Sequence, residues 1–354
     1  MNLFTPLELG ALRLRNRIVM APMTRSRSDA AAMPNAHMVE YYRQRASAGL
    51  IVSEGIAPSA NGLGYCRTPG LYSEAQVAGW RKVTDAVHAE GGCIVAQIMH
   101  VGRVASHYNK PEGSETVAPS AITAKAQMYT DQAGMQDMDA PRALTLGEIP
   151  AVIEEYRQAT RNALQAGFDG VELHCTSGYL PAQFLSTGTN QRSDAYGGPV
   201  ENRARFVLEV LRAMADVAGA DKVGMRICPG NPFNDLADED PQGTFDYLLD
   251  QASQLGLAYL HVIRMPTGPV DNLALAIRYF PGRLIGNESY KLEEAEAAVA
   301  SGELAAVSFG RSFIGNPDLV ARWEHKLPLA RFDMNTLYTP GPEGYTSYPT
   351  AGHD

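Results

Sequence analysis

The sequence predicts a (β/α)8 barrel, an α/β fold in which eight parallel strands alternate with helices. Short apolar runs rich in β-branched residues recur along the chain, as is typical of strands buried on both faces of a parallel sheet. Segments with helical period lie between these runs. No Gly-x-Gly-x-x-Gly motif follows a first strand, which disfavours the alternative, an open doubly wound sheet.

The eight candidate strands share this apolar pattern and end in polar or glycine-containing residues. They cover residues 17–24, 49–55, 92–100, 170–175, 223–229, 259–265, 283–289 and 306–311. Helical period indicates helices over residues 74–90, 145–166, 201–217, 243–255, 291–301 and 317–325. Thr145 and Glu148 have the spacing of a capping box, which predicts that the 145–166 helix begins there.

We expect residues 1–354 to form a single domain with two long irregular segments. Residues 103–146, after the third strand, are rich in Pro, Ser, Gly and Met and delay the next helix. Loops of this length are usually functional, so we interpret this one as an inserted lid subdomain on the catalytic face. Residues 327–354 form a tail with tyrosines among Gly and Pro, expected to pack as an ordered coil near the active site.

Composition narrows the class of protein. The net charge is −9 with no Lys/Arg stripe, which argues against nucleic-acid binding. No apolar stretch reaches membrane-spanning length, and the first residues lack a signal-peptide pattern. Widely spaced cysteines without a CxxC pair argue against a metal site and favour buried free thiols in a cytoplasmic enzyme. They are Cys66, Cys93, Cys175 and Cys228.

Polar residues recur at the predicted strand ends, which converge on one face of a barrel. A single polar strand end is usually structural, but a ring of them is not needed by a packed barrel bottom. We therefore predict an active site on this face. Its candidates are Thr24, Glu54–Gly55, Gln97, His100, His174, Arg226, Asn287–Glu288 and Gly310–Arg311.

The chemistry of these groups indicates a nucleotide-like ligand. Backbone amides after the seventh and eighth strands, together with Arg311, would bind a phosphate. Thr24, Gln97 and Arg226 offer a hydroxyl, an amide and a fixed cation to the edge of a flat heterocycle. A phosphate site combined with a polar-edged ring site suggests flavin mononucleotide (FMN).

Several long stretches carry a resemblance to a known family. They include LFTPLELGALRLRNRIVMAPMTR (3–25), NQRSDAYGGPVENRARF (190–206), GRSFIGNPDLV (310–320) and NTLYTPGPEGYTSYPT (335–350). On these motifs the chain resembles the Old Yellow Enzyme family of FMN-dependent ene-reductases over nearly its whole length. The 190–206 pattern is long and specific, and we expect it to fix loop and helix packing.

The resemblance implies a cofactor site. The family's flavin pocket falls on Pro22, Met23, Thr24, Gly55, Gln97 and Arg226, and its phosphate grip on Asn287, Glu288, Gly310 and Arg311. Thr24 would bond the flavin O4 edge, Gln97 would read the pyrimidine ring, and Arg226 would face N1 and O2.

The resemblance also implies a substrate site and a reaction. His174 matches the histidine that binds the substrate's activating oxygen, Tyr179 the proton donor, and Tyr338 a tail tyrosine beside the substrate. NADH or NADPH would reduce flavin N5 and leave, after which an enone, enal, nitroalkene or nitrate ester would bind above the same face. Shared use of one site implies ping-pong kinetics.

Three positions depart from the family pattern. Ser177 stands where relatives have Asn or His, so the second donor to the substrate oxygen is shorter. Met99 stands where many relatives have Trp, which predicts a softer and roomier substrate wall. Glu288 puts an acidic side chain beside the phosphate grip, where it would repel phosphate unless it points away.

Other functions remain open at this level. The family's dienoyl-thioester reductase branch is disfavoured because a cysteine cluster and a second dinucleotide domain are missing. A flavin-free lyase or aldolase, or a ligand-binding barrel without turnover, is the alternative from another class. An aldolase would use a strand-end lysine, which none of the eight strands offers. The sequence leaves open whether the protein is a monomer or a homo-oligomer.

Overall fold

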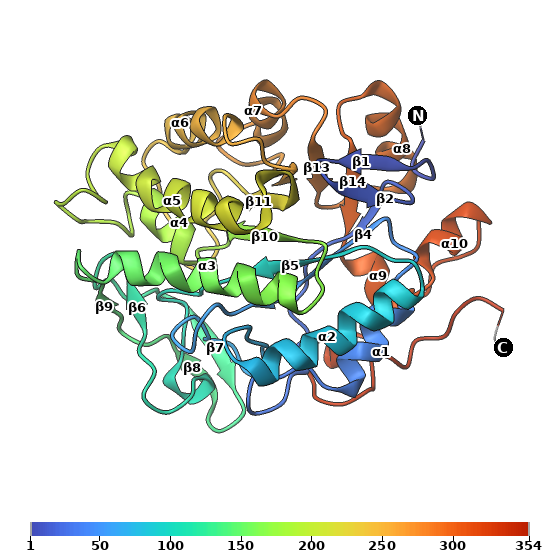
Figure 1. Cartoon of the computed structure of the whole chain (residues 1–354), viewed down its shortest axis with the longest axis horizontal. Helices are drawn as coiled ribbons and strands as arrows, with labels where there is room; N and C mark the ends of the chain where they lie inside the picture. The colour runs from blue at the N-terminus through green and yellow to red at the C-terminus, as the bar shows by residue number, and fades with distance from the viewer. Residues whose placement is uncertain (1, 353–354) are drawn as a thin grey trace.

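The computed structural model describes residues 2–352 and contains a closed barrel of eight parallel strands (Figure 1). Its strands are β3 (Ile18–Met20), β4 (Leu50–Ile56), β5 (Ile94–Ile98), β10 (Gly170–Cys175), β11 (Val223–Ile227), β12 (Tyr259–Ile263), β13 (Leu284–Asn287) and β14 (Ala306–Phe309). The last strand, β14, pairs with the first, β3, and closes the ring. Each strand coincides with one of the predicted runs, so the predicted barrel is confirmed.

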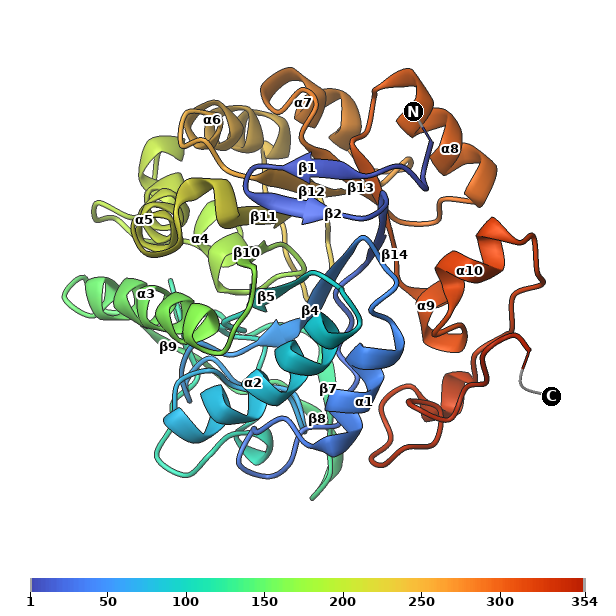
Figure 2. The ribbon, with the colours of Figure 1, turned by 45° about the vertical axis from the view of Figure 1, so that its right-hand side comes forward.

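Helices surround the barrel (Figure 2). Six of them match the helical patterns: α2 (Glu74–Ala89), α3 (Ile149–Gln165), α5 (Val200–Ala218), α6 (Pro241–Ser253), α8 (Leu292–Ser301) and α10 (Leu319–Glu324). Four further helices were not predicted: α1 (Ala36–Gln44), α4 (Leu180–Leu185), α7 (Asn272–Tyr279) and α9 (Arg311–Gly315). Each of these four has nine residues or fewer, so its apolar period is a weak signal, although the six-residue α10 was found.

The predicted capping box of α3 is wrong. The helix begins at Ile149, its N-cap is Glu148, and no side chain caps it. Only one half of the reciprocal pair forms: the Glu148 carboxylate accepts a hydrogen bond of 2.7 Å from the Thr145 backbone N–H. The same carboxylate also binds the guanidinium of Arg142, at 2.9 Å, which ties the helix start to the preceding insertion.

An N-terminal hairpin fills one end of the barrel. Strands β1 (Leu7–Leu9) and β2 (Leu12–Leu14) pair antiparallel and lie across that end (Figure 2). Their leucines Leu9, Leu12 and Leu14 pack with apolar side chains of the barrel interior, among them Val95 and Ile285. A separate and larger core lies between the barrel and its helices. Because one end is filled with apolar side chains, ligands must enter at the other.

The insertion after β5 contains its own small strands. β6 (Val117–Ala118) pairs with β9 (Arg142–Ala143), and β7 (Gln127–Thr130) forms a hairpin with β8 (Gly134–Asp137). The hairpin projects from the body of the molecule at the lower edge of Figure 1. A short 3-10 turn, η1 (His107–Asn109), precedes these strands.

The C-terminal tail is held by buried arginines that follow β3. Arg25 Nε and Arg27 Nη1 both donate to the Leu337 carbonyl, at 3.2 and 2.5 Å. Tyr345 is fully buried and stacks on Tyr41 of α1, with ring centroids 4.0 Å apart. These contacts fix the tail beside the carboxyl end of the first barrel strand. The tail also contains the 3-10 turn η3 (Met334–Thr336).

Within residues 2–352, no helix combines the length and apolar character needed to cross a membrane. All four cysteines are free thiols, and three of them are buried, whereas Cys93, which was expected to be buried, is only partly buried.

We predict that Gly224→Ala destabilises the barrel. A Cβ atom at Gly224 would lie 2.2 Å from Cζ of Tyr259, whose ring is fully buried in the barrel interior. Overpacking of this kind costs about 1–3 kcal/mol of the free energy of unfolding. Urea denaturation followed by circular dichroism measures the change. Gly147→Ala is the control, because its Cβ would meet no atom within 4 Å; equal unfolding midpoints for the two variants would contradict the prediction.

Candidate active site

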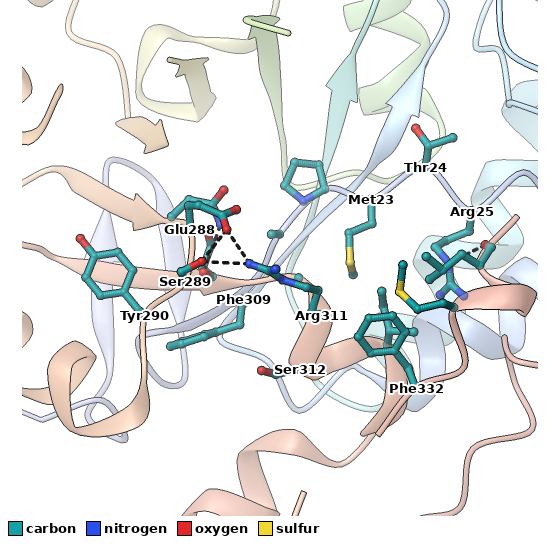
Figure 3. A pocket seen from close by; sticks show the side chains of 18 of the residues that line it. Met23, Thr24, Arg25, Glu288, Ser289, Tyr290, Phe309, Arg311, Ser312 and Phe332 are labelled. Atoms are coloured by element: carbon teal, nitrogen blue, oxygen red, sulfur yellow. Dashed lines mark hydrogen bonds and ion pairs between the residues drawn. The ribbon is translucent and has the colours of Figure 1, made fainter. Parts of the chain in front are cut away.

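A cavity of about 420 Å³ opens at the carboxyl ends of the strands (Figure 3). We call it the strand-end cavity. It is lined by segments that follow β3, β13 and β14, by Arg226 of β11 and by the tail. The predicted site residues that line it are Pro22, Met23, Thr24, Arg226, Asn287, Glu288, Gly310, Arg311 and Tyr338. The fold thus brings together most of the residues that were expected to hold the cofactor.

A second cavity of about 630 Å³, the outer cavity, adjoins the first. Thr24, Met334 and Tyr338 line both, so the two cavities are neighbours at these residues. Tyr179 lines the outer cavity. The β7–β8 hairpin also contributes to this wall, through Gln127, Met128, Tyr129, Met135 and nearby Met138.

Arg226 is the buried cation of the strand-end cavity. Its Nη2 donates to Oδ1 of Asn287 at 2.7 Å. Its Nε is buried and has no hydrogen-bond partner among the described residues. Buried donors without a partner are rare, and one beside a cavity fits an acceptor atom of a ligand. Burial lowers the pKa of Arg226, but a guanidinium stays charged at neutral pH.

The loop after β13 has unusual backbone geometry. Glu288 and Ser289 both have positive φ, at 83° and 56°. Such conformations cost a non-glycine residue about 1–3 kcal/mol each and are found at functional sites. The side chains of this loop contact Arg311 at one side of the strand-end cavity (Figure 3).

Glu288 points toward Arg311 rather than away from it. Its Oε1 lies 2.5 Å from Arg311 Nη2 and accepts a hydrogen bond from Ser289 Oγ at 2.6 Å (Figure 3). Arg311 also donates to Ser289 Oγ at 3.0 Å. The arginine that was expected to bind phosphate is therefore already paired with a carboxylate.

Gly55, Gln97, Met99 and His174 line neither cavity. Gln97 is buried and donates from Nε2 to Oε1 of Glu172 at 2.8 Å. The side chain of Met99 fills the space beside Gly55, where an added Cβ would lie 2.5 Å from its Sδ. Met99 belongs to the apolar cluster that contains Tyr179, so it packs behind the outer cavity.

His174 lies near the carboxyl end of β10, and its ring packs against that of Tyr179. The two rings meet edge to face with centroids 4.8 Å apart. Burial, and then the charge of Arg226, hold the pKa of His174 well below its ordinary value of 6.5. The ring is therefore neutral, and its Nδ1 is buried with no partner in the described chain. A neutral imidazole has one donor nitrogen and one acceptor nitrogen.

Tyr179 is a protonated phenol at neutral pH, because burial raises its pKa well above 10. Its hydroxyl lies 3.2 Å from that of Tyr65, which also receives a 3.5 Å contact from Asn234 Nδ2. Tyr65 and Asn234 line the outer cavity and were not predicted from the sequence. The signal for Tyr65 was its place in the loop after the second barrel strand; no motif marks it.

The side chain of Ser177 does not line either cavity. Ser177 has a φ of 59° and is followed by Gly178 with a φ of 77°, so both lie in a tight turn. Its backbone carbonyl accepts a hydrogen bond of 2.8 Å from Asn234 Nδ2. The expected role of its hydroxyl as a donor to the substrate therefore gains no support from the geometry.

The family model for the NADH:flavin oxidoreductase / NADH oxidase family matches residues 2–330. The chain belongs to this family. It is therefore an FMN-dependent oxidoreductase of the Old Yellow Enzyme family, as the resemblance implied, and the flavin-free lyase is set aside.

Relatives of this oxidoreductase cover almost all of its length. It is 43% identical over 352 residues to a probable flavin mononucleotide-dependent alkene reductase of Leishmania infantum, covering 97% of this chain and 96% of the relative. The 12-oxophytodienoate reductase 1 of Oryza sativa subsp. japonica is 40% identical, with 98% and 92% covered. A solved structure of morphinone reductase in complex with tetrahydroNAD has 44% identity, a TM-score of 0.95, and 100% and 99% covered.

We predict that Glu288→Gln tightens FMN binding by roughly two- to fivefold, because exposed charge pairs contribute about 0.2–1 kcal/mol. The change would remove a negative charge beside the expected phosphate site and free Arg311 from its ion pair. Flavin-fluorescence titration of the apoprotein measures the dissociation constant. Riboflavin, which has no phosphate, should bind both proteins equally.

Glu293→Gln, an exposed carboxylate in the first turn of α8, is the matched control. Unchanged FMN affinity in Glu288→Gln, or an equal gain for riboflavin, would show that Glu288 does not compete with the phosphate.

Proposed function

We propose that this oxidoreductase reduces electron-poor C=C bonds of enones, enals and nitroalkenes, with NADH or NADPH as reductant. The observation that carries the proposal is the edge-to-face contact of a neutral His174 with a protonated Tyr179, whose side chain lines the outer cavity. The names of the relatives, an alkene reductase and a 12-oxophytodienoate reductase, support the same reaction class. The tetrahydroNAD complex of morphinone reductase supports a nicotinamide reductant.

The cofactor residues are proposed from their place around the strand-end cavity. Arg226 would stabilise negative charge on the ring, Thr24 would bond its edge, and Asn287, Gly310 and Arg311 would hold the phosphate end. When bound, FMN would supply the redox chemistry, taking a hydride from the nicotinamide and giving one to the alkene.

His174 and Tyr179 would act on the substrate. The neutral imidazole would donate a hydrogen bond to the activating carbonyl or nitro oxygen and draw electron density from the alkene. Tyr179 would protonate the α-carbon. The Tyr65 hydroxyl, 3.2 Å from that of Tyr179, would stabilise the resulting phenolate and link it to the outer cavity.

The outer cavity favours substrates with a large apolar body. Met128 and Met138 form part of its wall, and its rim carries Phe233 and Met135, which are 57% and 56% exposed. Arg67, the single Arg or Lys in the lining, is already engaged by Asp131 and by the carbonyl of Tyr338. Neutral, extended alkenes are thus better matched to this cavity than anionic ones.

We infer that residues 1–354 act as one FMN-binding domain, with the 103–146 insertion as the lid and the 327–354 tail beside the active site. The insertion and the tail both contribute to the outer cavity, which supports this arrangement. A cytoplasmic location is proposed because four free thiols are typical of a reducing compartment.

Tyr179→Phe should slow alkene reduction by roughly 100- to 10,000-fold, the usual contribution of a positioned acid. Flavin reduction by NADH or NADPH should stay within about twofold, since it needs no proton from Tyr179. Stopped-flow absorbance of the flavin measures both half-reactions, with 2-cyclohexenone as the alkene.

Tyr196→Phe is the control, because Tyr196 bonds Glu209 on α5 and lines neither cavity. Equal slowing of both half-reactions in Tyr179→Phe would remove this residue as the proton donor. A purified protein that contains FMN but reduces no activated alkene would overturn the proposed function itself.

A further inference from the structure

A buried polar layer crosses the barrel at the level of Glu172. This residue of β10 is fully buried, and its carboxylate is surrounded by donors from two other strands. It accepts from Gln97 Nε2 at 2.8 Å, from the Tyr259 hydroxyl at 3.0 Å and from His261 Nδ1 at 3.0 Å. A buried carboxylate is costly unless such partners satisfy it, so its position in the barrel interior calls for a function.

The layer lies between the apolar plug and the strand-end cavity. The hydroxyl of Tyr259 donates a hydrogen bond to Glu172, and its ring packs in the apolar cluster with the N-terminal leucines. On the other side, His174 follows Glu172 by two residues and so lies on the same face of β10. His174 is paired in register with Arg226, which lines the cavity. The Glu172 carboxylate thus lies two residues deeper in the barrel than the His174–Arg226 pair, of which Arg226 lines the cavity.

Glu172 carries a negative charge there. Burial by itself would raise the pKa of this carboxyl, but contacts with His261, the charge of Arg226 and the bond from Gln97 bring it below its ordinary value. Burial lowers the pKa of His261, so this ring is neutral. Its Nδ1–H then donates to Glu172, and its Nε2 accepts from the Ser308 hydroxyl at 2.7 Å.

Glu172 also decides how the Gln97 amide is oriented. A carboxylate can only accept hydrogen bonds, so the amide nitrogen must face it. The amide oxygen then remains for a ligand, and no hydrogen bond from a described residue reaches it. Gln97 would therefore accept from a ring N–H and reject a ring carbonyl at that position. This is the donor pattern of a flavin pyrimidine edge.

We propose that Glu172 is a positioning residue for the cofactor. It fixes the Gln97 amide with its oxygen toward the ring and places a buried negative charge below it. That charge opposes the negative charge which the ring gains on reduction, whereas Arg226 favours it. Glu172 thereby lowers the reduction potential of the bound flavin. The inference rests on the proposed cofactor site, which Arg226 lines, and adds Gln97 to it as a contact of the ring, although Gln97 itself lines neither cavity.

The test is a potentiometric titration of the FMN-loaded enzyme with a reference dye. Glu172→Gln keeps the side-chain size and removes the charge. The ratio of reduced to oxidised flavin at a fixed potential should rise about tenfold, which is ~30 mV for a two-electron couple. The FMN dissociation constant should rise at least threefold, because a glutamine at 172 lets the Gln97 amide turn over.

Glu172→Asp separates the two effects and serves if Glu172→Gln does not fold. It keeps the charge but withdraws it from Gln97, so the potential should stay near that of the parent while FMN binds at least threefold more weakly. Glu209→Gln is the control, since Glu209 likewise accepts from a tyrosine hydroxyl, at 2.8 Å, but on α5 outside the barrel.

An unshifted potential in Glu172→Gln, or an equal shift in Glu172→Asp, overturns the inference. Either result in an enzyme that still reduces alkenes leaves the proposed function intact. A protein that retains FMN but lacks alkene reduction overturns the proposed function, and the potentials still decide the role of Glu172.

Discussion

Closure of the barrel between its last and first strands is the constraint on which the site depends. Val307 and Ser308 of β14 lie in register with Ile18 and Val19 of β3, and the Ala21 N–H continues the ladder to the Phe309 carbonyl at 3.1 Å. Because all eight strands are parallel, this closure brings every carboxyl end to one face. The segments after β3 and β14, far apart in sequence, thereby line the same cavity.

Apolar, anionic and cationic side chains follow one another along the axis of the barrel. The apolar plug of Leu9, Leu12 and Leu14 closes one end. The Glu172 carboxylate lies above this plug and accepts three hydrogen bonds from side chains of the barrel. Arg226 lies one step nearer the cavity and keeps an unpartnered Nε. The unsatisfied cation favours a ligand whose charge becomes more negative during turnover, whereas the satisfied anion below it opposes that charge.

The tail completes the site through backbone contacts that a sequence motif does not reveal. Arg25 and Arg27 bind main-chain carbonyls of the tail, Leu337 among them, and their guanidinium groups also lie over the ring of Tyr345. Tyr338, the next residue, is 58% exposed and borders both cavities. Its place beside the substrate therefore depends on arginines that follow the first barrel strand.

The sequence by itself determined the barrel, because eight apolar runs and six segments of helical period are local signals, and the convergence of the polar strand ends then follows from topology. Only the tertiary structure decided which side chains contact one another and which of them line the cavities. It paired Glu288 with Arg311, turned Ser177 out of both cavities, and brought Tyr65 to Tyr179. Those outcomes depend on positive φ angles and on contacts between distant loops, which residue spacing does not encode.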